Sequence, residues 1–305
     1  MKQIVADKYK KTPSTLAMNL DNKKYGVIWA STLNLGDDIQ TLAAIHLLQE
    51  NNIVDYTFID RERLKSYKGE LVHLVMNGWF THDKSQFPPS NKIIPIFISF
   101  HCADPKLVKL HAKYFKKWAP IGCRDVSTLN LMKKYDIPAY FSGCLTLAFN
   151  ECNVASNKNY IVDINNKDSY IPNIQADISN YTDFQTINHT TKLNKFNRDG
   201  KLAAAEGLLN KYRSANLVVT SRIHCAMPCR AFNTDVLFIY HNYNTDKRFS
   251  GIKSYLNGQS GWDEIDESKK AIDRSDINNI RHRIKDMFTH IIQHETTDYK
   301  FLMGR

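Results

Sequence analysis

Residues 217–229 read LVVTSRIHCAMPC, in which a short apolar run leads through an arginine and a histidine into a helix-like run. The first four residues are typical of a buried strand, and the small and apolar residues from Cys225 onward are typical of a buried helix. The N-terminus of a helix has unpartnered backbone N–H groups and a dipole that favours negative charge. Because Arg222 and His224 lie at that position, we expect a phosphate or carboxylate to bind there. The alternative is a chance placement of two basic residues on the surface.

The same alternation of strand-like and helix-like runs extends through the chain. YGVIWA (25–30) precedes DDIQTLAAIHLLQENN (37–52), and KIIPIFISF (92–100) precedes PKLVKLHAKYFKKW (105–118). Strands interleaved with helices favour a parallel sheet that is covered on both faces. The sequence therefore predicts an α/β fold.

A second α/β unit begins after a polar stretch without periodicity, NECNVASNKN (150–159), which we interpret as a linker. Strand-like runs resume at NYIVDIN (159–165) and continue to DVLFIYH (235–241). At 305 residues the chain exceeds what one hydrophobic core usually organises. We therefore expect two domains, residues 1–152 and 153–305.

Composition excludes several classes of protein. No segment approaches the ~20 consecutive apolar residues that span a bilayer, and the first residues show no apolar core of a secretory signal. The six cysteines form no Cys-x-x-Cys pair, which favours a reducing, cytoplasmic location and core packing of the thiols. We find no cluster of metal ligands at a suitable spacing and expect no metal.

The formal net charge of +10 favours anionic ligands. The lysines are scattered among many asparagines rather than gathered in blocks, so an ordinary solvated lysine surface is the alternative. Without lysine blocks and interleaved stacking aromatics, we expect no nucleic-acid partner.

Ligands of open α/β sheets bind beyond the carboxyl ends of the strands, and the strand ends of this chain carry polar groups. In NLGDDIQ (34–40), Gly36 allows close backbone approach, and Asp37 or Asp38 can serve as a general base or simply cap the helix. In IGCRD (121–125), Arg124 stands beside a helix N-terminus, where it can bind an anion or form a salt bridge.

Aromatic and hydrogen-bonding groups at two further strand ends suit a sugar. Trp79, in NGWF (77–80), can stack on a sugar ring, while Asn77 and His101 can bond to hydroxyl groups. Core packing is the alternative for the aromatic residues.

Three motifs together resemble the polysaccharide pyruvyl transferase family. They are NLGDDIQTLAA (34–44), PIGCRDVSTLNLMKKYDIPAYFSGCLTL (120–147) and VVTSRIHCAMPCRAFNTDVLFI (218–239). The resemblance implies two Rossmann-like domains similar to the B-type glycosyltransferase fold, with the active site in the interdomain cleft. It also implies transfer of a pyruvyl group from phosphoenolpyruvate onto two hydroxyls of a sugar or polysaccharide as a ketal.

By this resemblance Arg124, Arg222 and His224 contact phosphoenolpyruvate, and we place the adjacent Ser221 in the same site. On chemical grounds, His224, with an intrinsic pKa near ~6.5, is the expected general acid, and Asp37 or Asp38 accepts a hydroxyl proton. The expected acceptor-binding residues are Asn34, Gly36, Asn77, Trp79 and His101. Phosphoenolpyruvate is the co-substrate in this scheme, and no cofactor is expected.

Two other functions fit parts of the sequence. A nucleotide-sugar-dependent B-type glycosyltransferase would also present helix N-termini and basic residues to a diphosphate. A non-catalytic basic module would bind nucleic acid or anionic polysaccharide with a steep dependence on salt.

Overall fold

The computed structural model describes residues 23–80, 83–152, 157–163, 181–260 and 265–294. Its first part is a six-stranded parallel sheet with the order β2-β1-β3-β4-β5-β6. The strands are β1 (Tyr25–Trp29), β2 (Tyr56–Asp60), β3 (Val72–Trp79), β4 (Ile93–His101), β5 (Ile121–Cys123) and β6 (Ala139–Phe141). The helices of this part are α2 (Leu35–Glu50), α3 (Pro105–Leu110), α4 (Ala112–Lys117) and α5 (Val126–Lys133). Short 3-10 turns are η1 (Arg61–Arg63), η2 (Lys84–Gln86) and η3 (Leu145–Ala148).

A second, four-stranded parallel sheet follows, with the order β10-β9-β7-β8. Its strands are β7 (Lys158–Val162), β8 (Phe184–Ile187), β9 (Ala215–Thr220) and β10 (Asp235–Phe238). The helices of this part are α7 (Arg198–Arg213), α8 (Ile223–Phe232), α9 (Lys253–Leu256) and α10 (Arg274–His294), with 3-10 turns η5 (Lys247–Phe249) and η6 (Glu267–Lys270).

Strand composition explains why the sheets are parallel and covered on both faces. Strand β4 reads IIPIFISFH and is buried along almost its whole length, which is the continuous apolar pattern of a doubly covered strand. On β4, Phe97 belongs to one hydrophobic cluster, whereas its neighbours Ile96 and Ile98 belong to another. Alternate residues of one strand therefore supply two cores, one on each face of the sheet.

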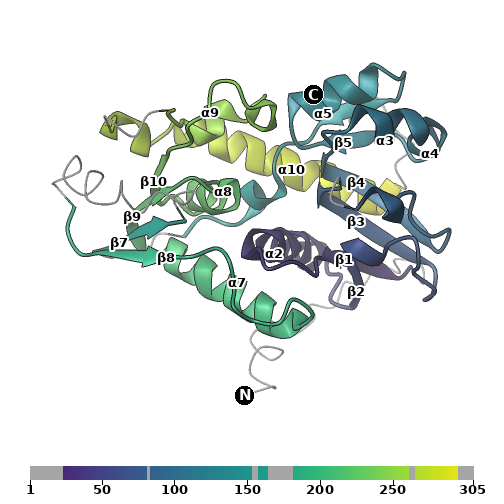
Figure 1. Ribbon diagram of the computed structural model, residues 1–305, viewed down its shortest axis with the longest axis horizontal. Coiled ribbons are helices and arrows are strands. Elements are labelled where there is room, and N and C mark those ends of the chain that lie inside the picture. Colours follow the sequence, from purple (N-terminus) through teal and green to yellow (C-terminus); the bar gives the residue numbers. More distant parts are fainter. Residues whose placement is uncertain (1–22, 81–82, 153–156, 164–180, 261–264, 295–305) are drawn as a thin grey trace.

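Both sheets contribute to one of these hydrophobic clusters. It contains Val27 and Ile98 of the first sheet together with Val162 and Val218 of the second. Figure 1 shows α2 and α8 between the two sheets, with α7 below them and the long α10 crossing behind. The two sheets are therefore held by a common packed interior rather than by a single connecting segment.

Polar contacts join the two parts at the N-terminus of α2. The Leu35 N–H donates to the His189 carbonyl at 2.8 Å, and the Thr191 N–H donates to the Leu33 carbonyl at 2.9 Å. A further contact comes from α10, where Arg281 donates through Nε to the Phe149 carbonyl at 3.0 Å.

The predicted α/β class and parallel sheets are confirmed, and so is the strand-to-helix transition in 217–229, because β9 ends at Thr220 and α8 begins at Ile223. The boundary between 152 and 153 stays a prediction, and residues 153–156 lie outside the described residues. Within the described ranges, no helix has the length and apolar character needed to cross a bilayer. The cytoplasmic location also stays a prediction.

A buried ion pair connects α2 to α7. The Lys201 Nζ lies 3.3 Å from the Asp38 Oδ1, and neither side chain is exposed. Lys201 also donates to the Ala30 carbonyl, and its ammonium lies 5.4 Å from the centre of the Trp29 ring. Two charges with so little contact with water depend on each other, since removal of one leaves the other buried and uncompensated.

We predict that Lys201→Met lowers the free energy of unfolding by about 3 kcal/mol, the usual effect of breaking a buried pair. The double variant Lys201→Met/Asp38→Leu should recover much of this loss, because it removes both charges. Chemical denaturation measures the change, and Lys211→Met on the exposed side of the same helix is the matched control. An unchanged midpoint in Lys201→Met would contradict the prediction.

Candidate active site

The first turn of α8 lies directly against the N-terminus of α2. A Cβ built on Gly36 would lie 3.4 Å from both the Cβ and the Nδ1 of His224. The absence of a side chain at Gly36 thus allows the imidazole to approach the α2 backbone. The motifs NLGDD and SRIH, far apart in the sequence, therefore meet in space.

Asp37, the next residue of α2, is held by two residues from the first part of the chain. The Thr32 hydroxyl donates to its Oδ2 at 2.9 Å, and Arg61 places Nη1 3.3 Å from Oδ1 and Nη2 3.4 Å from Oδ2. Burial raises the pKa of Asp37, but the Arg61 charge, the Thr32 hydrogen bond and nearby His224 together lower it below its usual value. Asp37 is therefore ionised at neutral pH and lies close enough to His224 to interact with it.

Asp38 occupies a different environment from Asp37. It is fully buried against Lys201, and burial raises its pKa to about 7 although Lys201 opposes this shift. The sequence offered Asp37 and Asp38 equally as proton acceptors. In the structure, Asp38 serves the packing of α2 on α7, and we keep Asp37 alone as the candidate base.

His101, Arg124 and Asp125 form a buried polar cluster at the ends of β4 and β5. The Nδ1 of His101 lies 2.6 Å from Asp125 Oδ2, and Arg124 Nη2 lies 3.4 Å from the same oxygen. Asp125 also caps α5, since its Oδ1 accepts from the Thr128 N–H at 2.9 Å. Burial and the Arg124 charge lower the pKa of His101. The salt bridge that the sequence left open for Arg124 is thus present, while its Nε has no hydrogen-bond partner.

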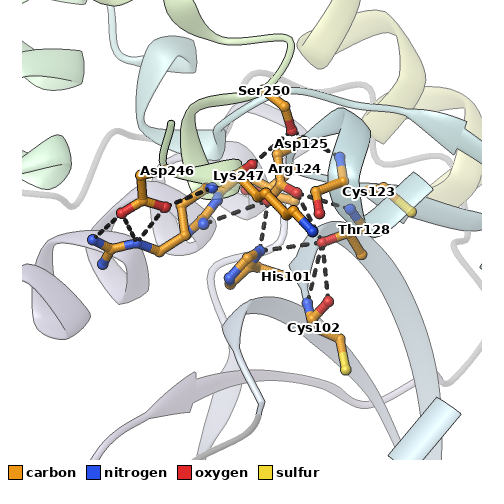
Figure 2. A network of polar contacts seen from close by, with 12 residues as sticks. His101, Cys102, Cys123, Arg124, Asp125, Thr128, Asp246, Lys247 and Ser250 are labelled. Carbon is orange, nitrogen blue, oxygen red and sulfur yellow. Dashed lines mark hydrogen bonds and ion pairs between the residues drawn. The ribbon is translucent and has the colours of Figure 1, made fainter. Parts of the chain in front are cut away.

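A loop of the second part of the chain covers the start of α5 (Figure 2). The Ser250 carbonyl accepts from the Val126 N–H at 3.0 Å, and the Ser250 hydroxyl accepts from the Ser127 N–H at 2.8 Å. Within this loop Arg248 pairs with Asp246 and donates to the Tyr240 hydroxyl at 2.8 Å. The loop brings Arg248 close enough to His101 to help lower the pKa of that imidazole.

Arg222 is the N-cap residue of α8 and makes no side-chain capping bond. Its Nε and Nη2 each lie 2.5 Å from Oδ2 of Asp163, while Ser221 donates through Oγ to the Asp163 carbonyl at 2.7 Å. The Arg222 side chain remains 39% exposed, in contrast to buried Arg124. A protein carboxylate therefore offsets the positive charge that the sequence placed at this helix N-terminus.

His224 is neutral in this arrangement. Burial and the Arg124 charge, with smaller contributions from His189 and His101, lower its pKa to about 3, although Asp37 opposes the shift. The pKa of His224 thus lies well below the intrinsic value of a histidine, and its role as general acid stays a prediction. The influence of Arg124 also shows that the loop carrying it and the first turn of α8 lie close together.

The remaining predicted acceptor residues have different surroundings. The Asn34 Oδ1 accepts from the Gly36 N–H at 3.1 Å and caps α2, and Asn34 pairs with Thr190 in an isolated antiparallel bridge. Asn77 is buried and donates to the Gln40 carbonyl at 3.0 Å. Trp79 is 40% exposed. Asn34 and Trp79 are thus exposed, whereas Asn77 is buried.

Several residues around the site were missed at the level of sequence: Arg61, Asp163, His189 and Arg248. His189 is buried, with Nε2 2.6 Å from the Tyr212 hydroxyl, and its carbonyl anchors α2. Arg61, Asp163 and His189 all follow directly or closely after strands, so the strand-end rule applied to every strand could have found them. Arg248 lies beyond the last strand of the sheet, so the strand-end rule does not apply to it; its segment, TDKRFSGIKSYL (245–256), resembles a basic C-terminal segment of the family, but the resemblance assigns no role to Arg248.

Residues 34–243 match the family model described as Polysaccharide pyruvyl transferase. The chain belongs to this family. The matched span contains every residue that the sequence predicted for the site and also Arg61, Asp163 and His189, whereas Arg248 lies outside it. As a member of the pyruvyl transferase family, the protein is a transferase with a role in polysaccharide pyruvylation.

Among solved structures, a functionally uncharacterised protein of Klebsiella pneumoniae has 14% identity and a TM-score of 0.47, covering 82% of this chain and 93% of that one. Staphylococcus aureus MnaA with UDP has 10% identity and a TM-score of 0.37, with 93% and 98% covered. Escherichia coli heptosyltransferase WaaC with ADP has 11% identity and a TM-score of 0.30, with 86% and 99% covered. No curated protein matches the chain.

The lowered pKa of His224 predicts a dependence of stability on pH. Between pH 6.5 and about 3 the unfolded chain binds a proton at this residue and the folded chain does not, so acid favours unfolding. The free energy of unfolding should fall as pH drops below 6.5, with His224 contributing up to about 1 kcal/mol per pH unit. His224→Gln should reduce this slope, measured by urea denaturation at pH 7, 6 and 5.

Exposed His241→Gln is the control for loss of a histidine as such. Equal slopes in the wild type and His224→Gln would show that the imidazole is not held neutral.

Proposed function

We propose that this pyruvyl transferase moves the pyruvyl group of phosphoenolpyruvate onto two hydroxyls of one sugar in a polysaccharide acceptor, forming a ketal and releasing phosphate. The observation that carries the proposal is the approach of His224 to Gly36, which brings the first turn of α8, our proposed anion site, next to the ionised carboxylate of Asp37. We place this site in a cleft between the two sheets.

The two anionic groups of phosphoenolpyruvate suit the cations of this site. Arg124 has an unpartnered buried Nε, and the first backbone N–H groups of α8 have no side-chain cap. Arg222 uses Nε and Nη2 for Asp163, and a guanidinium has five N–H donors, so donors remain for a second anion. We propose that Arg124, Arg222 and the Ser221 backbone region hold the phosphate and carboxylate through charge-assisted hydrogen bonds.

Anion binding would also change the charge of His224. Burial is the largest cause of the lowered pKa of His224 and the Arg124 charge is the next, so a bound phosphate, which would offset Arg124, would raise this pKa. We propose that the protonated fraction of His224 formed with substrate delivers its proton to C3 of the enol, which leaves an oxocarbenium-like C2. The cationic form is thus coupled to the presence of substrate.

Asp37 is the proposed base for the acceptor. One sugar hydroxyl adds to C2 as Asp37 takes its proton, the C2–O bond to phosphate breaks, and the second hydroxyl closes the ketal. Of the two hydroxyl protons, one balances the proton delivered to C3 and the other leaves with phosphate. We propose that the acceptor lies beside Trp79 and His101, with Asn34, Gly36 and Asn77 shaping the backbone around it. The scheme uses no cofactor beyond phosphoenolpyruvate as co-substrate.

Replacement of Arg222 by Met or of His224 by Gln should lower phosphate release from phosphoenolpyruvate by at least ~100-fold, the usual contribution of a positioned acid–base group. The assay uses a panel of hexosides and follows both phosphate and the ketal methyl signal by NMR. Arg198→Met, which alters a partly exposed surface arginine of α7, is the matched control. Full turnover in both site variants would refute the assignment.

Phosphoenolpyruvate should raise the pKa of His224 from about 3 by at least one unit, because its negative charge offsets that of Arg124. Histidine NMR titration with and without phosphoenolpyruvate measures the shift, and His224→Gln identifies the signal. The same titration with a panel of nucleoside diphosphates is the comparison. A shift produced by the nucleotides and not by phosphoenolpyruvate would favour a nucleotide-sugar donor.

A further inference from the structure

Arg61 lies at the carboxyl edge of the first sheet and belongs to neither the predicted nor the proposed site. It begins the 3-10 turn η1 directly after β2, and its side chain is only 5% exposed. The N-cap residue Asp60 accepts from the Ser31 N–H at 3.2 Å and from the Glu62 N–H at 3.1 Å with the same oxygen. This contact fixes η1 to the loop that leads from β1 to Asp37.

The guanidinium of Arg61 faces the carboxylate of Asp37 with two nitrogens. The separations are 3.3 Å from Nη1 to Oδ1 and 3.4 Å from Nη2 to Oδ2, and the Asp37 side chain is 11% exposed. Glu62 accepts from the remaining Nε at 2.8 Å, which fixes the plane of the guanidinium. Such a fork orients a carboxylate more strictly than a lysine can.

A small cavity lies beside this pair. It is a partly open hollow with a volume of about 10 Å³, enough for one water-sized group such as a hydroxyl, and is lined in part by Asp37, Arg61 and Asn77. Gln40, also in the lining, is buried, and its Oε1 has no hydrogen-bond partner. Gly78 has a φ of +98°, and a Cβ there would lie 3.2 Å from that Oε1, so a side chain at this position would crowd the amide. The cavity thus has a polar wall that suits hydroxyl groups.

We propose that Arg61 is the positioning residue of the acceptor site, where it aims the carboxylate of Asp37 at a sugar hydroxyl in this cavity. This inference rests on the proposed pyruvyl transfer. Arg61 acts on the acceptor half of the reaction, so phosphoenolpyruvate binding does not depend on it.

The charges around Asp37 decide how the loss of Arg61 would change the pKa of this carboxyl group. Besides Arg61, the charged or titratable groups that influence it are His224 of α8 and Asp38 of α2, and Glu62 of η1 pairs with Arg61 itself. Without the Arg61 guanidinium, burial and the neighbouring Asp38 would raise the pKa of Asp37, and the Thr32 hydrogen bond would oppose this rise only in part. A base acts only when it is deprotonated. A higher pKa of Asp37 would therefore move the acidic limb of the pH–activity profile to higher pH.

The test compares Arg61→Gln and Arg61→Lys with Arg63→Gln, which changes the exposed arginine of the same turn. Ketal formation is measured from pH 4 to 8 with saturating phosphoenolpyruvate and an accepting hexoside. We expect Arg61→Gln to lower kcat about 100-fold, to leave the KM for phosphoenolpyruvate within twofold, and to move the acidic limb to higher pH. Because Arg61→Lys keeps the charge, its kcat should be about tenfold higher than that of Arg61→Gln. Arg63→Gln should behave as the wild type.

Asp37→Asn provides the second variant. If Arg61 acts through Asp37, then Arg61→Gln causes no further loss of kcat in the Asp37→Asn background. If Arg61→Gln does not fold, Arg61→Lys decides the question, because its loss of kcat should also vanish in the Asp37→Asn background. An active wild type with an unmoved acidic limb in Arg61→Gln, or losses in either Arg61 variant that add to the loss in Asp37→Asn, would overturn the inference alone. A wild type that forms no ketal with any acceptor overturns it together with the proposed function.

Discussion

The contact between His224 and the Cβ-free backbone of Gly36 is the constraint on which the site depends. A Cβ at position 36 would lie in van der Waals contact with the imidazole and only 3.1 Å from the Asn34 Oδ1, so a larger side chain has little room between the first turn of α8 and the start of α2. Those two helix N-termini carry the strand-end loops of different sheets. Their close approach therefore turns two separate sets of polar groups into one.

The cations of the site are each matched by a carboxylate before any substrate is considered. Arg61 faces Asp37, Arg124 faces Asp125 and Arg222 faces Asp163. Buried charges require such partners, because the energetic cost of removing an ion from water is large. The same pairing fixes the direction of each guanidinium in advance, which is what positioning of a small, doubly anionic substrate requires.

The pairing also explains which parts of the site the sequence could and could not supply. The α/β class followed from the alternation of apolar and amphipathic runs, and Arg222 and His224 were placed correctly at the start of a helix because β9 and α8 are strongly patterned. A one-dimensional pattern contains no information on which charges become neighbours, so it could not foresee that burial and the nearby Arg124 charge would together lower the pKa of His224. Asp163 and His189 closely follow β7 and β8, yet nothing in the sequence indicates that Asp163 would pair with Arg222 or His189 with Tyr212.

The adjacent carboxylates of α2 show the same limit most clearly. Consecutive helical residues point about 100° apart, a direct result of 3.6 residues per turn, so two identical side chains enter unlike surroundings. Asp37 meets a guanidinium fork, a hydroxyl and His224, and its pKa falls. Asp38 meets a single ammonium in the interior between α2 and α7. Burial there raises its pKa to about 7, although the ammonium opposes this rise. The chemical distinction between a candidate base and a structural ion pair is therefore made by the packing of α7 on one side of α2 and of η1 on the other.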